Sequence, residues 1–306
     1  MKKVRKNPWR GSYAIPITPF HEDDTINYAA LEQEFQFLLE SGVGAVCYPV
    51  LVSEFDTLSE AERLEVNARA IAWGKTADVP VIVSVSSVNT NIAVHLAAEA
   101  ERRGADMVIA MPPYTRKADF SVIREYYSRI DREVSCPIMI QNHGMAGGLT
   151  PEQIRILCEE NSHISWIKQE LDPEYEHVYR LMQANVPGLY GLAGGFAGEH
   201  MLEEYAMGAK GIVHSPQFAD YLQYAWNLLD DKLEKEGREA FFRLQPGISL
   251  ERKYGVQGSI YIMQKRGILP ENIYSRLKRD PLPGYAVRAL DEYYDFIEPY
   301  LIWKKS

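Results

Sequence analysis

The sequence is poor in cysteine, with only Cys47, Cys136 and Cys158 among its 306 residues. These three are widely spaced and form no Cys-x-x-Cys pair, which argues against a disulfide framework and against a structural zinc site. A chain of this length can bury a large core without such cross-links. We therefore expect a cytoplasmic protein that needs neither a metal nor a cofactor.

The sequence also lacks a long apolar run and an excess of positive charge. No stretch approaches the ~18 apolar residues of a membrane span. The basic N-terminal segment, MKKVRKNPWRGSY, is not followed by the apolar core of a secretory signal. The net charge is −9, whereas a nucleic-acid surface needs a positive footprint. We therefore expect neither a membrane partner nor a nucleic-acid partner.

Short apolar runs alternate with helical segments up to about residue 216. The runs are nearly continuous in hydrophobicity, which is typical of parallel strands buried on both faces. Strands are expected at residues 12–17, 45–52, 79–85, 106–111, 137–142, 164–170, 188–193 and 211–214. Helices are expected between them, at residues 28–39, 59–74, 89–104, 121–134, 151–160 and 174–185.

This alternation predicts a (β/α)8 TIM barrel, in which eight parallel strands close on themselves through right-handed crossovers. An open doubly wound sheet is the alternative, but no glycine-rich dinucleotide fingerprint follows the first strand. After residue 217 the pattern is wholly helical, with helices expected at 221–236, 238–256 and 285–303. We therefore expect residues 1–216 to form the barrel and residues 217–306 a helical layer packed on it, as one structural unit.

Catalytic groups of such barrels lie at the C-terminal ends of the strands. Lys168 ends an otherwise apolar strand, and loss of water inside a barrel favours the neutral amine that attacks carbonyl groups. Glu170 lies two residues further on, so both side chains point to the same face of a regular strand. Two alternatives remain open: Lys168 lies in water at the rim, and Glu170 caps a helix or belongs to a solvent-facing loop.

The chain resembles the dihydrodipicolinate synthase/N-acetylneuraminate lyase family over about residues 9–230. The resemblance rests on short motifs in order and at family-like spacing: GSYAIPITPF at 11–20, Glu54 followed by LSEAER at 58–63, PPY at 112–114, CPI at 136–138 and WIK at 166–168. It implies that Lys168 forms a Schiff base with a small-molecule 2-oxo acid. It also implies a homotetramer or a homodimer.

The chain departs from the family pattern where the family has its proton relay. Residues 50–54 read VLVSE in place of a Gly-Thr-Thr-Gly-Glu loop, and Gln141 replaces the tyrosine that ends the fifth strand. An amide cannot act as a general acid or base near neutral pH. The second tyrosine of the relay is Thr115, and the arginine of typical synthases falls at Ala146 or a neighbour. These changes argue against a true dihydrodipicolinate synthase and against a sialic acid lyase.

The altered pattern resembles the 2-keto-3-deoxy-L-arabonate dehydratases, which have a glutamine in place of the tyrosine and a glutamate two residues after the lysine. We therefore expect dehydration of a 2-keto-3-deoxy sugar acid, with Glu170 removing the C3 proton and assisting loss of the C4 hydroxyl. One alternative is a class I aldolase that releases pyruvate. Another is a non-catalytic 2-oxo acid binding protein that kept the barrel and lost the relay.

Further polar and glycine residues at the strand ends are candidates for binding the substrate. Ser53 and Tyr114 offer hydroxyls to a carboxylate, His143 and His214 titrate in a useful range, and Gly194 permits close backbone approach. The alternatives are structural: the polar side chains cap helices or pack at the rim, and the glycine serves a tight turn. The sequence shows no metal-ligand spacing. The substrate-binding candidates are Ser53, Glu54, Tyr114, Gln141, Asn142, His143, Gly194 and His214.

Overall fold

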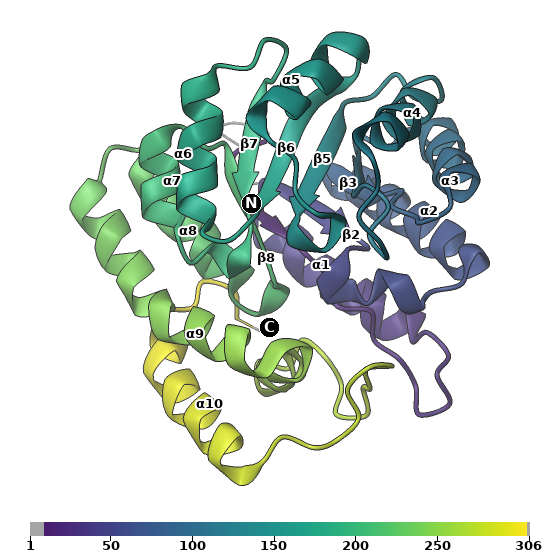
Figure 1. The fold of residues 1–306 in the computed structure, drawn as a ribbon. Coiled ribbons are helices and arrows are strands. Elements are labelled where there is room, and N and C mark those ends of the chain that lie inside the picture. Colours follow the sequence, from purple (N-terminus) through teal and green to yellow (C-terminus); the bar gives the residue numbers. More distant parts are fainter. Residues whose placement is uncertain (1–8, 305–306) are drawn as a thin grey trace.

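Eight parallel strands form a closed barrel in the computed structural model, which describes residues 9–304 (Figure 1). Each strand pairs with the next in chain order, and β8 pairs with β1 to close the ring. The expected TIM barrel is confirmed. Most of the basic N-terminal segment, residues 1–8, lies outside the described residues. The strands are β1 Gly11–Ala14, β2 Ala45–Tyr48, β3 Val81–Ser84, β4 Met107–Ala110, β5 Ile138–His143, β6 Ile164–Glu170, β7 Gly191–Gly194 and β8 Gly211–His214.

A helix follows each strand and packs on the outside of the ring. Two of these helices begin with a capping box: Ser59 and Glu62 cap the helix that begins at Glu60, and Thr150 and Gln153 cap the helix that begins at Pro151. The helices are α1 Tyr28–Glu40, α2 Glu60–Ala77, α3 Thr90–Arg103, α4 Phe120–Asp131, α5 Pro151–Glu160, α6 Glu174–Ala184, α7 Met201–Met207 and α8 Ala219–Asp230.

Two strands end three or four residues before their apolar runs do. β1 ends at Ala14 and β2 at Tyr48, whereas the runs continue to residues 17 and 52. Each run contains a proline, Pro16 or Pro49, which has no N–H to donate to the sheet. Beyond Pro49 the chain turns into a short 3-10 helix, Leu51–Ser53, over the C-terminal end of the barrel.

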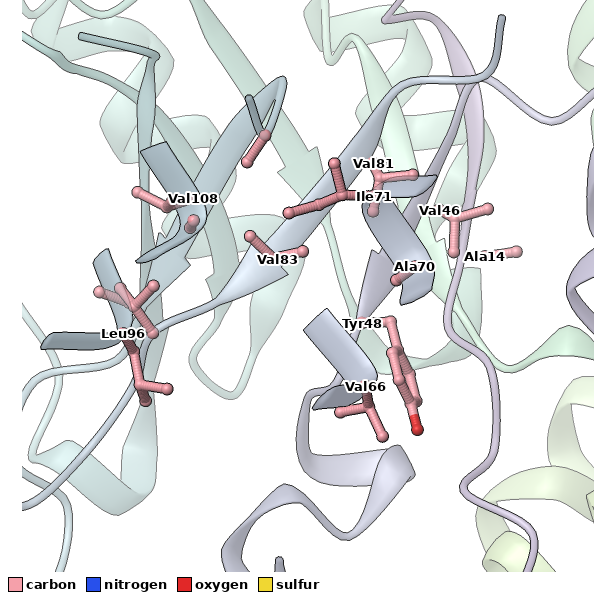
Figure 2. Packing of buried hydrophobic residues seen from close by; sticks show 14 of the residues in the cluster. Ala14, Val46, Tyr48, Val66, Ala70, Ile71, Val81, Val83, Leu96 and Val108 are labelled. Carbon is pink, nitrogen blue, oxygen red and sulfur yellow. The ribbon is translucent and has the colours of Figure 1, made fainter. Parts of the chain in front are cut away.

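The alternation along each strand separates two apolar layers. One cluster fills the barrel interior and draws its strand residues from one face, among them Met139, Trp166 and Val213. The alternate strand residues pack outward against the helices, as Val83 does beside α2 in Figure 2. A side chain at a strand end therefore points into the barrel if it lies two residues beyond an interior residue, and outward if it lies one residue beyond it.

Two further helices follow: α9 Glu234–Lys265 packs on α8, and α10 Gly284–Ile297 packs on α9 (Figure 1). α9 is longer than the helix expected at 238–256, although its backbone breaks at Gly255, where φ is 57°. α8 follows β8 as the other helices follow their strands, and the division of the chain at residue 216 stays a prediction. Within residues 9–304, no helix is long and apolar enough to cross a membrane.

Candidate active site

Strands β5 and β6 bring three polar side chains together at the C-terminal end of the barrel. Gln141 and Lys168 are paired in the β5–β6 register, each two residues beyond an interior side chain. Nζ of Lys168 lies 2.8 Å from Oε1 of Glu170. The amide of Gln141 donates to Oε2 of the same carboxylate at 2.8 Å. The two oxygens of Glu170 therefore have separate partners, one cationic and one neutral.

Burial differs between the members of this ion pair. The side chain of Lys168 is 2% exposed and that of Glu170 is 12% exposed. The amine therefore lies inside the barrel and not in water at the rim, and the carboxylate lies nearer the solvent. A buried ammonium is stabilised by such a partner, and transfer of its proton to the carboxylate would leave a nucleophilic neutral amine.

Two successive glycines at the end of β7 make room for carboxylates on opposite faces. A Cβ atom at Gly195 would overlap Cγ of Glu170 and lie 2.7 Å from its Oε1. A Cβ atom at Gly194, which faces the other way, would overlap the carboxylate of Glu204. The missing side chain of Gly194 therefore accommodates Glu204 of α7, and it is Gly195 that adjoins Glu170. The sequence offers only the glycine pair as a signal for this, because the carboxylates that it faces depend on how α7 packs on β7.

The loop after β5 is held by the two residues that follow Gln141. Asn142 both donates to and accepts from the backbone of Leu149, at 3.1 and 2.7 Å, so its side chain serves the loop. His143 pairs with Glu170 in the register and accepts from the backbone N–H of Met145 at 3.1 Å. Burial lowers the pKa of His143, and the charge of Glu170 opposes that shift. His143 is therefore a neutral ring beside the carboxylate.

Ser53 and Glu54 brace the loop after β2. The hydroxyl of Ser53 donates to the carbonyl of Pro16 at 2.6 Å. Glu54 has a positive φ of 54°, and its carboxylate accepts from the hydroxyl of Ser275 and from the N–H of Arg276. Both side chains have partners in neighbouring loops and none in the Lys168–Glu170 pair.

An apolar wall adjoins Gln141 on the side away from Lys168. Its central residue, Met111, follows the paired residues Ala110 and Ile140 of β4 and β5, which places it beside Gln141 in the barrel. The ring of Tyr114 lies 5.6 Å from that of Phe55, and burial raises the pKa of the Tyr114 hydroxyl. The apolar wall consists of Leu51, Phe55, Met111, Tyr114 and Ala146.

His214 points away from the barrel interior. It follows Val213, an interior residue, and its ring lies 2.5 Å from the hydroxyl of Ser12 and 2.6 Å from the carbonyl of Ser215. Burial lowers the pKa of His214 to about 4, so the ring is neutral near pH 7. Across residues 9–304, no group of three or more His, Cys, Asp or Glu side chains could hold a metal ion.

Comparison with known proteins yields both a family and several relatives. The model of the dihydrodipicolinate synthetase family matches residues 8–219. The L-2-keto-3-deoxyarabonate dehydratase of Azospirillum brasilense is 25% identical over 287 residues, which cover 90% of this chain and 89% of that protein. The probable 2-dehydro-3-deoxy-D-pentonate aldolase YjhH of Escherichia coli (strain K12) is 32% identical over 208 residues, or 66% of this chain and 68% of that protein.

The fold is shared with solved structures. One is YagE, a prophage protein of E. coli K12 that belongs to the dihydrodipicolinic acid synthase family and was crystallised in complex with pyruvate. Its TM-score is 0.82 at 19% sequence identity, over 96% of this chain and 99% of that one. At this identity, the likeness shows the fold alone.

Proposed function

The chain belongs to the dihydrodipicolinate synthetase family of class I lyases, and from this premise we propose that it dehydrates a 2-keto-3-deoxy sugar acid through a Schiff base on Lys168. The observation that carries the proposal is the 2.8 Å contact between Nζ of Lys168 and Oε1 of Glu170 inside the barrel. This contact supports a nucleophile and a proton carrier that act on one small substrate.

The first stage forms the covalent bond. Glu170 takes a proton from the Lys168 ammonium, and the resulting amine attacks C2 of the 2-oxo acid. Glu170 then returns the proton to the C2 hydroxyl of the carbinolamine, and this group leaves as water. The product is an iminium between Nζ and C2, which withdraws electrons from C3 and acidifies its protons.

The second stage is the elimination. Glu170 removes a C3 proton, and the electron pair of that bond forms the enamine. The enamine expels the C4 hydroxyl as Glu170 protonates it, so that a C3–C4 double bond forms and a second water leaves. Gln141 cannot exchange protons near neutral pH. Its hydrogen bond instead holds Oε2 of Glu170 and leaves Oε1 turned toward Lys168.

The apolar wall supports a substrate with an uncharged far end. None of its five side chains carries a charge, and burying an unpaired carboxylate against such a surface is costly. A 2-keto-3-deoxy pentonate or hexonate, whose only carboxylate adjoins the 2-oxo group, meets this condition. A substrate with a second carboxylate at the far end does not.

The second candidate function is retro-aldol cleavage of the same kind of substrate. It is favoured by the similarity to the E. coli protein named as an aldolase. In that reaction Glu170 would take the proton of the C4 hydroxyl, the C3–C4 bond would break, and pyruvate would be released. The two reactions share Lys168 and differ in their products.

Borohydride trapping tests the proposal. The protein is incubated separately with pyruvate, a 2-keto-3-deoxy pentonate and a 2-keto-3-deoxy hexonate, then reduced and analysed by intact-mass and peptide mass spectrometry. We expect an adduct on Lys168 that is lost in Lys168→Ala, and a dehydrated skeleton with one of the sugar acids. A pyruvate-sized remnant from a sugar acid would instead identify the aldolase. No adduct with any of the three would overturn the proposal and favour a binding protein.

A further inference from the structure

Apart from the Lys168–Glu170 ion pair, two carboxyl groups lie buried side by side behind the end of β7. Glu174 is the first residue of α6 and Glu204 lies in α7, and they are 1% and 0% exposed. Glu174 accepts a hydrogen bond from the N–H of Gly195 through Oε1. In the described part of the chain, no N–H or hydroxyl group donates to the other oxygen of Glu174 or to either oxygen of Glu204.

These two carboxyl groups must share a proton. An ionised carboxylate without donors is very costly to bury, and the two groups lie within hydrogen-bond reach of each other. Burial raises the pKa of Glu204 well above its usual range, and the charge of Glu174 adds to that shift. Glu204 is therefore the neutral acid that donates, and Glu174 is the carboxylate that accepts.

Glu174 itself titrates near neutrality. Burial raises its pKa to about 7, while the N–H of Gly195 and the hydrogen bond from Glu204 oppose the shift. Above about pH 7 the pair therefore carries one negative charge, and below about pH 7 it takes up a second proton and becomes neutral.

Gly195 connects this pair to the proposed active site. Its N–H binds Glu174, while Glu170 packs against its α-carbon, where a Cβ atom would overlap the Glu170 side chain. The charge of Glu170 also helps to raise the pKa of Glu174. Electrostatic coupling between two charged groups is reciprocal, so a charge on Glu174 acts in turn on Glu170.

We propose that Glu174 and Glu204 are positioning residues that share one proton, and that the charge of this pair makes Glu170 a stronger base. The inference rests on the proposed role of Glu170 in proton transfer at C3. The other charged groups that face Glu174 and Glu204 are Lys168 and Glu170 of β6 and Glu203 of α7. His143 of β5 faces Glu170. His143 titrates below its usual range because it is buried, and Glu203 is exposed.

Pyruvate provides a probe that isolates this step from the identity of the sugar acid. Its iminium with Lys168 has methyl protons at C3, and in D2O the base removes one and returns a deuteron. The exchange rate at saturating pyruvate, measured by proton NMR from pH 6 to pH 9, reports on the base within the adduct. We expect the rate to rise by about threefold through an inflection near pH 7 as Glu174 ionises.

Isosteric variants separate the two members of the pair. In Glu174→Gln we expect the inflection to disappear, because burial keeps Glu204, the carboxyl group that remains, protonated. In Glu204→Gln we expect it to remain, because an amide donates to Glu174 as the neutral acid does. Glu176→Gln, an exposed change in the same helix as Glu174, is the control and should retain the wild-type profile. Glu204→Leu should move the inflection to higher pH, because Glu174 loses the hydrogen bond that lowers its pKa.

The possible results are distinct. An inflection that persists in Glu174→Gln would overturn the inference, as would its loss in Glu204→Gln. A variant that loses the same factor at every pH would have a structural role only, which also overturns it. If Glu174→Gln fails to fold, the test rests on Glu204→Leu. An inflection at the wild-type pH in that variant would overturn the inference. Absence of any pyruvate adduct in the wild type would overturn the proposed function together with this inference.

Discussion

A single carboxyl group serves every proton transfer in the proposed mechanism. Gln141 occupies the place of a tyrosine in the family pattern, and an amide neither gains nor loses a proton near neutral pH. His143 is a neutral ring that accepts a backbone hydrogen bond. We therefore propose Glu170, which contacts both Lys168 and Gln141, as the group that carries protons between C3, C4 and the amine.

Replacing that carboxyl group by its amide should separate covalent bonding from elimination. In Glu170→Gln we expect the dehydration rate to fall by at least about 100-fold, in the range typical of losing a general acid–base group. The borohydride-trapped adduct with pyruvate on Lys168 should still form, although more slowly. The measurement is steady-state dehydration alongside intact-mass trapping. Wild-type turnover in this variant would rule out Glu170 as the base.

At this scale the sequence predicts that the side chains of Lys168 and Glu170 lie together, and they are in contact. Lys168 and Glu170 could be found because they end one apolar strand and share a face. Asn142 and His214 end strands too, but they lie one residue away from the interior positions Gln141 and Val213, and a one-residue offset reverses the direction of the side chain. A rule based on strand ends alone does not make this distinction.

The acids behind β7 could not be predicted, because their proximity depends on how α6 and α7 pack on the strand. Glu174 and Glu204 are 30 residues apart in the sequence, and nothing in the sequence distinguishes them from the exposed glutamates around them. The Gly194–Gly195 pair is a weak signal that becomes informative only when the groups on each face are known.

The end of β7 is an element whose backbone shape supports the site. Gly195→Ala would introduce a Cβ atom into the space of Glu170 and displace the carboxylate from Lys168. A misplacement of about 1 Å can cost on the order of 100-fold in rate. We therefore expect a loss of that order in dehydration by Gly195→Ala, while a Schiff base with pyruvate is still trapped.

The matched control for that change is Gly144→Ala in the loop after β5. Nothing lies within 4 Å of a Cβ atom at Gly144, and its φ is not in the left-handed region. Dehydration by the control should stay within about twofold of the wild type. Equal losses in the two variants would mean that the effect of Gly195→Ala is not specific to the contact with Glu170.

Element boundaries depend on local chemistry that the hydrophobic pattern does not contain. The apolar runs through β1 and β2 continue past Pro16 and Pro49, but the strands end before these residues because the ladder loses a donor. The reverse holds for α9, where the helical hydrogen bonds resume after Gly255 and extend the helix to Lys265. Periodicity therefore predicted the order of the elements better than their lengths.

At the scale of the whole molecule, a buried ion pair joins the C-terminal helices to the barrel. Arg266, just after α9, binds Asp220 of α8 through two hydrogen bonds of 2.9 Å, and their side chains are 2% and 1% exposed. Arg266 also donates to the carbonyl of Gln217, in the loop that follows β8. Asp220 accepts from the backbone N–H groups of Ile302 and Trp303 near the C-terminal end.

If the helical layer and the barrel are one structural unit, breaking this junction should lower the stability of both together. Asp220→Asn leaves a buried guanidinium without its counter-charge, and we expect the free energy of unfolding to fall by about 3 kcal/mol. Asp291→Asn, which breaks the exposed pair with Lys265, should cost less than about 1 kcal/mol. Far-UV circular dichroism and tryptophan fluorescence should report one coincident transition in urea for both variants. Two separated transitions would show instead that the C-terminal helices unfold independently of the barrel, and an equal cost for the two variants would remove Asp220 as the residue that ties them together.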